Sequence, residues 1–250
     1  MNFYVVIALA FGPGAFWLWY FYKKDNLEPE PKTLVLRMFI LGMIGVIPAF
    51  LAELIFQYPI QLITSSTFFS SYMLLVVGAP IIEEYIKFWL VKRGVYNNVE
   101  FNEPMDGIVY TAAAALGFAS LENLGYVGGA YMTTLDAPSG SSEIVWSVFI
   151  IRAIFSVPAH VLFSAMWGYA LGASKFMRDR ERARLFVRRG LILSMLLHGT
   201  FNTVINFPLA MAFMLAFMFL AWRMVRYRIT VALVNSPFAG ANYCEQDFVE

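Results

Sequence analysis

The chain has 250 residues, of which 60% are hydrophobic and only 14% are charged, and its formal net charge is +1. Soluble domains carry about 25% charged residues, so this composition excludes a disordered chain and argues against a soluble globule. The near-neutral charge excludes a basic nucleic-acid-binding protein. Because the mean hydropathy is +0.64, a lipid bilayer is the expected environment. The single cysteine, Cys244, excludes a disulfide framework and a cysteine-based zinc site.

Seven stretches of the chain are apolar and long enough to cross about 30 Å of hydrocarbon, which takes roughly 20 helical residues. The sequence therefore predicts an all-α, polytopic transmembrane helical bundle of about seven spans. Pro208 separates the last two spans, because proline ends or kinks a helix. In chain order the predicted spans are 3–22, 34–57, 72–91, 107–131, 145–175, 190–206 and 208–225.

Lysine and arginine mark alternate ends of these spans. They follow the first, third, fifth and seventh spans, whereas residues 58–71, residues 132–144 and the break at Pro208 contain none. The positive-inside rule therefore predicts an N-terminus outside the cell and a cytoplasmic C-terminus, and a six-span chain would put the final arginines on the wrong side. We expect one membrane domain over residues 1–228 and a cytoplasmic tail over residues 229–250.

A few ionisable residues fall inside the predicted spans, where a charge at the bilayer centre costs about 3 kcal/mol on insertion scales. Such residues normally face a bundle interior or a water-filled cavity. Glu83 and Lys87, four residues apart, can form a structural ion pair, but this does not explain Glu84, which points about 100° away. The whole set is Glu83, Glu84, Lys87, Glu122, His160 and His198. Three further charges near span ends are interpreted as reaching the lipid headgroups: Arg37, Glu53 and Arg152.

The two histidines lie on helix faces that predict contact with other helices. His160 belongs to a ridge of small residues at four-residue spacing, which lets membrane helices approach closely. His198 and Asn202 lie one turn apart on one face, and Glu122 is followed directly by Asn123. The small residues of the ridge are Ser156, Ser164, Gly168 and Gly172.

Depth in the membrane tests whether these residues can meet. At 1.5 Å per residue, Glu84 and His198 lie about 12–13 Å from the cytoplasmic edges marked by Lys92 and Arg189, and Glu122 and His160 lie about 22–24 Å from the cytoplasmic edges of their own spans. The difference of about 10 Å is either a real separation or an effect of helix tilt and misplaced span ends.

Carboxylates, imidazoles and an amide in a water-accessible cavity suit the activation of water by a general base. A glutamate can accept a proton from water, while an imidazole and an asparagine donate hydrogen bonds to a tetrahedral oxyanion. The sequence has no His-Glu-x-x-His zinc motif, no Gly-x-Ser-x-Gly nucleophile elbow and no pair of membrane aspartates. The combination predicts a hydrolase with a Glu/His site.

Several motifs, taken in chain order, are shared with a known family. Residues 83–87 read Glu-Glu-Tyr-Ile-Lys, residues 118–123 read Phe-Ala-Ser-Leu-Glu-Asn, and His160 and His198 follow. In order, spacing and membrane placement they resemble the Glu-Glu-x-x-Lys, Phe-x-x-x-Glu-Asn and two histidine motifs of the PrsW family of bacterial intramembrane proteases. The segments 24–31 and 106–110 also resemble family features, and the resemblance covers residues 3 to about 225.

The resemblance implies a glutamate-dependent membrane endopeptidase. It relates the chain to the CAAX prenyl protease and bacteriocin-processing group, in which a glutamate and a histidine are thought to activate water without a metal or other cofactor. It also implies a multi-pass protein of the bacterial cell membrane. The implied partner is a membrane-anchored protein substrate such as an anti-sigma factor, whose site-1 cleavage starts a stress response.

The same resemblance assigns roles to residues. Glu83 and Glu84 are the candidate bases, and Lys87 is their electrostatic partner. Glu122 stands where the related group has a histidine, so that His160 becomes the implied partner of the base. The complete catalytic set is Glu83, Glu84, Lys87, Glu122, Asn123, His160, His198 and Asn202, of which the last two would serve the oxyanion.

Three other interpretations remain open at this stage. Membrane glutamates and histidines also form proton relays, so a proton-coupled transporter is an alternative, although the sequence shows no inverted repeat. Three carboxylates and two imidazoles could ligate zinc. A membrane scaffold with polar groups between its helices is the least specific alternative, because interhelical hydrogen bonds contribute well under about 2 kcal/mol each and poorly offset five ionisable groups.

Overall fold

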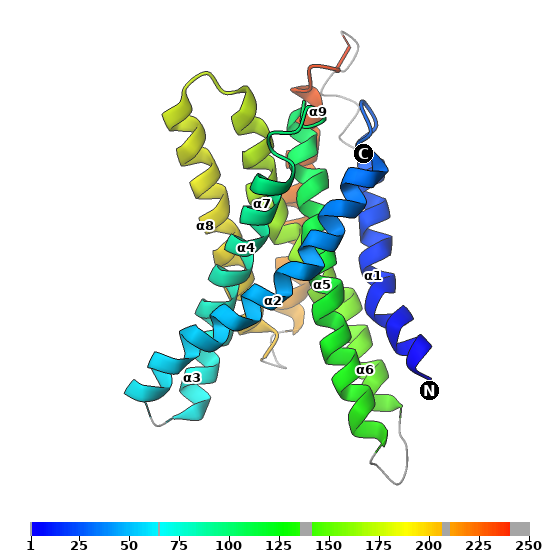
Figure 1. The fold of residues 1–250 in the computed structure, drawn as a ribbon, viewed down its shortest axis with the longest axis vertical. Coiled ribbons are helices and arrows are strands. Elements are labelled where there is room, and N and C mark those ends of the chain that lie inside the picture. Colours follow the sequence, from blue (N-terminus) through cyan, green and yellow to red (C-terminus); the bar gives the residue numbers. More distant parts are fainter. Residues whose placement is uncertain (1, 65, 136–141, 207–210, 241–250) are drawn as a thin grey trace.

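The computed structural model describes residues 2–64, 66–135, 142–206 and 211–240, and all regular structure within these ranges is helical. Two pairs of α-helices continue into one another through π-helices, so the described chain forms seven helical rods (Figure 1). This confirms the predicted all-α bundle. The elements are α1 (Phe3–Lys24), α2 (Lys32–Ile63), α3 (Thr67–Met73), η1 (Leu74–Gly78), α4 (Ala79–Gly94), α5 (Pro104–Leu135), α6 (Glu143–Ile151), η2 (Arg152–Ser156), α7 (Val157–Phe176), α8 (Arg180–Val204) and α9 (Met211–Val234).

Three of the rods are apolar and long enough to cross a membrane by length and composition alone: α1, α2 and the rod from Glu143 to Phe176. The count of seven spans and the orientation of the termini stay predictions. The C-terminal ends of α1, α4 and α7 lie at one end of the bundle, which we call the basic end (Figure 1). The basic residues at these helix ends are Lys23, Lys24, Lys92, Arg93 and Lys175.

Several helices extend further than the hydropathy pattern predicts. The arginines expected in a loop before residue 190 mostly lie on α8, which begins at Arg180 because the Asp179 side chain accepts hydrogen bonds from the next backbone N–H groups. Helix α9 continues to Val234, so the helix includes residues assigned to the cytoplasmic tail. The predicted break at Pro208 lies outside the described residues.

Helices α5 and α7 form the centre of the bundle (Figure 1). Their side chains are small enough for the backbones to touch: a Cβ added to Gly107 would lie 2.3 Å from the carbonyl oxygen of Gly168, and one added to Gly172 would lie 2.3 Å from that of Pro104. The small-residue ridge predicted around His160 is therefore the contact surface between these two helices, which fixes His160 in the interior.

The two π-helices have a common cause in the sequence. Each ends two residues before a proline, Pro80 after η1 and Pro158 after η2. Proline has no backbone N–H and its ring displaces the preceding turn, which a π-turn accommodates with one additional residue. If the π-turn continued, the backbone N–H of residue 80 would donate to the Leu75 carbonyl, but Pro80 has no backbone N–H. The Asn202 side chain supplies this donor, with Nδ2 at 2.8 Å from the Leu75 oxygen.

Candidate active site

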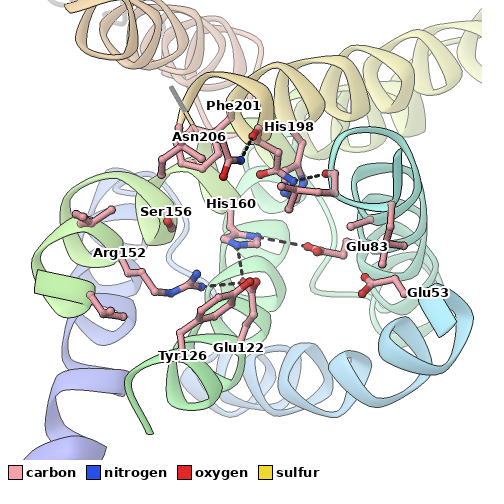
Figure 2. A pocket seen from close by; sticks show the side chains of 18 of the residues that line it. Glu53, Glu83, Glu122, Tyr126, Arg152, Ser156, His160, His198, Phe201 and Asn206 are labelled. Atoms are coloured by element: carbon pink, nitrogen blue, oxygen red, sulfur yellow. Dashed lines mark hydrogen bonds and ion pairs between the residues drawn. The ribbon is translucent and has the colours of Figure 1, made fainter. Parts of the chain in front are cut away.

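A cavity of about 570 Å³ is lined by side chains from α2, both π-containing rods, α5 and α8. Figure 2 shows how these side chains surround it. Five residues of the predicted catalytic set line it: Glu83, Glu122, His160, His198 and Asn202. The other three, Glu84, Lys87 and Asn123, are fully buried and lie behind the lining. The two groups of residues therefore have different surroundings, although the sequence placed them in one set.

Glu84 is bound by donors on all sides. Its Oε1 accepts from Lys87 Nζ at 2.7 Å and lies 3.2 Å from His198 Nδ1. Its Oε2 accepts from three further side chains at 2.7–2.9 Å: Ser164, Trp167 and Ser194. These partners come from α4, α7 and α8. A carboxylate with both oxygens occupied is a poor proton acceptor, so Glu84 joins helices and positions its neighbours.

Lys87 and His160 connect the two groups of residues that the depth estimate separated. Lys87 Nζ lies 3.1 Å from His160 Nδ1, and His160 Nε2 lies 2.9 Å from Glu122 Oε2. An ammonium group only donates, so Nδ1 is the acceptor and Nε2 carries the proton that is donated to Glu122. Of the two explanations left open for the 10 Å difference in depth, these contacts exclude a real separation. For His198 the span end was misplaced, because Arg189 lies inside α8.

Glu122 is held by a second cation, Arg152. Arg152 Nη2 donates to Glu122 Oε2 at 3.0 Å (Figure 2). Arg152 Nε donates to Asn123 Oδ1 at 2.8 Å. Asn123 in turn donates to the backbone carbonyl of Ala10 at 3.1 Å, which ties α5 to α1. Asn123 therefore orients Arg152 from behind the cavity.

Glu83 differs from Glu84 because one of its oxygens has no hydrogen-bond donor within the described chain. Its side chain lines the cavity, and Oε2 has no hydrogen-bond donor among the described residues. Lys87 Nζ lies 3.3 Å from this oxygen, outside hydrogen-bond geometry, and His160 Nδ1 lies 3.8 Å away. Glu83 thus reaches the cavity with its side chain, while its Oε2 is enclosed between the Lys87 ammonium group and the His160 ring.

His198 and Asn202 line the cavity from α8. The rings of His198 and His160 meet edge to face with their centroids 5.2 Å apart. Because the fully bonded Glu84 carboxylate is an acceptor, Nδ1 of His198 is the donor in this contact, and in the tautomer that has its proton on Nδ1 the other nitrogen, Nε2, is an acceptor. Asn202 uses one N–H on the Leu75 carbonyl and keeps a second one.

Two of the headgroup interpretations are wrong. Arg152 is 9% exposed and pairs with Glu122, since the rod that carries it begins at Glu143. Glu53 lines the cavity, because α2 continues ten residues beyond it to Ile63. Arg37 is exposed, as expected.

Sequence reasoning also missed the residues that bind Glu84. Ser164 lies four residues after His160, and Ser194 lies four residues before His198. Each serine therefore shares a helix face with a histidine of the predicted site. That spacing is the signal that could have identified them, whereas Trp167 carries no such signal.

A bundle of apolar helices that encloses glutamates and histidines in one cavity has the organisation of an intramembrane hydrolase. Residues 30–225 match the family described as PrsW family intramembrane metalloprotease. The Protease PrsW of Geobacillus kaustophilus is 34% identical over 79% of this chain and 78% of its own length. Those of Bacillus subtilis and Oceanobacillus iheyensis are each 30% identical, over 88% and 92% of this chain and 91% and 97% of their own lengths. No solved structure matches the chain.

The chain therefore belongs to the PrsW family of intramembrane proteases, and it is a multi-pass protein of the bacterial cell membrane. This confirms the family resemblance of the motifs.

The word metalloprotease in the family description implies a metal ion, and the cavity offers one candidate group. Single ligand atoms of Glu83, His160 and His198 lie within 4.8 Å of one another, and such donor types suit zinc. The arrangement of charge does not suit it. Lys87 Nζ already lies at 3.1 Å and 3.3 Å from two of the three ligand residues, and Glu122 accepts from the other His160 nitrogen. A dication would have to displace a buried ammonium group, so these residues as arranged do not form a metal site.

Proposed function

We propose that the chain is an intramembrane endopeptidase that hydrolyses a peptide bond of a membrane-anchored protein, with Glu83 as the general base. The single observation that carries this proposal is that the Glu83 side chain lines the cavity next to His160 and His198, whereas Glu84 lies behind the lining with both oxygens bound by donors. A water molecule in this position would donate one proton toward Glu83 and the other toward the acceptor nitrogen of His198. Its lone pair then faces the substrate carbonyl carbon.

Three neighbouring groups prepare Glu83 for this role. Lys87 Nζ lies 3.3 Å from Glu83 Oε2 and places a positive charge next to the carboxyl group. His160, oriented by Lys87 and Glu122, lies with its acceptor nitrogen Nδ1 3.8 Å from the same oxygen and forms the cavity wall beside it. Glu84 fixes Lys87 and His198 from behind, so the geometry does not depend on the substrate.

The remaining N–H of Asn202 is the proposed donor to the oxyanion that forms when water adds to the carbonyl. The resemblance assigned His198 to this role as well, but the tautomer imposed by Glu84 makes Nε2 an acceptor. Once Glu83 has taken the proton of water, it can return that proton to the leaving amine, as a general base does in the second half of a hydrolysis.

A second pocket suggests the route of the substrate. It lies between α2 and α5 and shares Glu53, Glu83, Glu122 and Tyr126 with the main cavity. Exposed apolar residues of α2 such as Ile47 and Phe50 lie along the same helix. A transmembrane segment entering sideways from lipid would reach Glu83 between these helices. We propose an anti-sigma factor with one membrane span as the substrate, on the basis of the family resemblance.

The test uses the purified chain in liposomes together with a tagged single-span anti-sigma factor from the host genome. Wild-type protein should produce one new N-terminus in or near the span, and Glu83→Gln should lower the rate by about 10²–10⁴-fold, as expected for a lost general base. The matched control is Glu181→Gln, an exposed glutamate on α8. Unchanged cleavage by both Glu83→Gln and Glu83→Ala would refute the proposed role. Flux of a solute coupled to pH, without proteolysis, would instead support the transporter, which family membership does not favour.

A further inference from the structure

A second cluster of acidic residues lies at the basic end of the bundle. Asp25 and Glu30 come from the connection between α1 and α2, Glu103 directly precedes α5, and Asp106 lies in its first turn. All four side chains are buried, with exposed fractions of 2% or less. Single carboxylate oxygens of Asp25, Glu103 and Asp106 lie within 4.8 Å of one another. We call these four residues the acidic cluster.

Most oxygens of the acidic cluster have no donor. Within the described parts of the chain, six of the eight lack a hydrogen-bond partner: both of Asp25, both of Glu103 and one each of Glu30 and Asp106. The two remaining oxygens are fixed from outside. Asp106 Oδ2 accepts from the backbone N–H of Glu103 at 2.7 Å, and Glu30 Oε2 accepts from the Tyr110 hydroxyl. In Asp106 and in Glu30, a hydrogen bond to one oxygen therefore fixes the orientation of the carboxyl group, and the other oxygen has no partner.

Nothing in the described chain neutralises these carboxylates. None of the ion pairs between described residues includes a member of the acidic cluster. Lys175 interacts with Asp106 only at a distance, because its Nζ donates to the backbone carbonyls of Tyr96 and Phe101 at 2.9 and 2.6 Å. Buried carboxylates without partners are unfavourable.

We propose that Asp25, Glu103 and Asp106, with Glu30 beside them, bind a hard divalent cation of the Ca²⁺ and Mg²⁺ class. The donors are oxygens only, which these cations prefer, whereas imidazole and thiolate ligands are absent from the acidic cluster. The six unpartnered oxygens are available as metal ligands. Hydrogen bonds from Glu103 and Tyr110 orient two of the carboxylates, as the residues around the ligands do in known metal sites. The bound cation would neutralise two of the four charges and fasten the α1–α2 connection to the start of α5.

This site is separate from the proposed protease centre, and its test needs no substrate. Full-length protein in detergent is stripped with EDTA, desalted and titrated with Mn²⁺, whose free ion is followed by electron paramagnetic resonance. We expect one saturable Mn²⁺ per chain, displaced by Ca²⁺ or Mg²⁺, and a higher unfolding temperature in the displacing ion. Asp25→Asn and Glu103→Gln should each weaken binding by at least about tenfold, since even supporting groups contribute that much to a metal site.

Two control variants define the location. Glu181→Gln replaces an exposed acid on α8 and should bind Mn²⁺ like the wild type. His160→Ala removes one of the three possible metal ligands in the protease cavity, Glu83, His160 and His198, and should also bind Mn²⁺ like the wild type. No saturable binding by the wild type would overturn the proposal and identify a cluster that holds protons only. Unchanged binding by both neutralised variants, or loss of binding in His160→Ala alone, would also overturn it. If the neutralised variants do not fold, the wild-type and His160→Ala titrations still decide.

Discussion

The neighbours Glu83 and Glu84 should separate activity from stability when each is replaced by glutamine. In Glu84→Gln the side-chain amide must face either the Lys87 ammonium, now 2.7 Å from Oε1, or the three donors on Oε2. Either orientation puts a donor against a donor in a fully buried position. Breaking a buried ion pair from one side costs about 3–5 kcal/mol, and each unsatisfied buried donor about 1–3 kcal/mol.

We therefore expect Glu84→Gln to lower the free energy of unfolding by about 3–5 kcal/mol or to prevent folding. In Glu83→Gln the buried Lys87 ammonium group keeps Glu84 as its partner at 2.7 Å, so stability should fall much less than in Glu84→Gln, while cleavage slows by about 10²–10⁴-fold. Thermal and denaturant unfolding in lipid nanodiscs, followed by circular dichroism, measures the first effect, and cleavage in liposomes measures the second. A Glu84→Gln protein as stable as wild type, or a Glu83→Gln protein as unstable as Glu84→Gln, would refute this division of roles.

Four shorter predictions follow from the same contacts. Arg152→Lys keeps the charge but cannot reach both of its partners, so cleavage should slow by up to about 100-fold, and an unchanged rate would contradict the positioning role. Asn202→Ala should lower the turnover number by about 10²–10³-fold with a small change in KM, the signature of a lost oxyanion donor; a change confined to KM would argue against it. Gly117→Ala should destabilise the fold by about 1–3 kcal/mol, because its Cβ would lie 1.9 Å from a backbone oxygen of α2, whereas Gly129→Ala in the same helix meets nothing and should be neutral in unfolding assays. The zinc chelator 1,10-phenanthroline should leave cleavage unchanged, and inhibition reversed by added Zn²⁺ would restore the metal mechanism.

Hydropathy was sufficient to predict the helical rods, because a membrane segment must satisfy its backbone internally and be apolar over its length. It could not predict where the helices end, since α2 and α8 continue well beyond their apolar stretches. That error explains both Glu53, assigned to a span end, and the misplaced depth of His198.

The residues of the site could be identified from the sequence because charge is rare in the spans. The sequence could not predict which of these residues line the cavity and which lie buried behind its lining. Glu83 and Glu84 are adjacent and chemically identical, and only the positions of Ser164 and Ser194 on other helices show which one is saturated with donors. Arg152 was assigned to the headgroups for a related reason, because its partner Glu122 lies thirty residues earlier in the chain.

The π-helices before Pro80 and Pro158 also affect how related sequences are aligned. Each holds one residue more than the α-turn it replaces, and one residue corresponds to a rotation of about 100°. A homologue that lacks this residue would keep the same hydropathy profile but present a different helix face next to the cavity. An alignment with such a homologue therefore needs a single-residue gap within residues 74–78 or 152–156. Without the gap, cavity-lining residues of this chain such as Leu75 and Ser156 would be aligned with lipid-facing residues of the homologue.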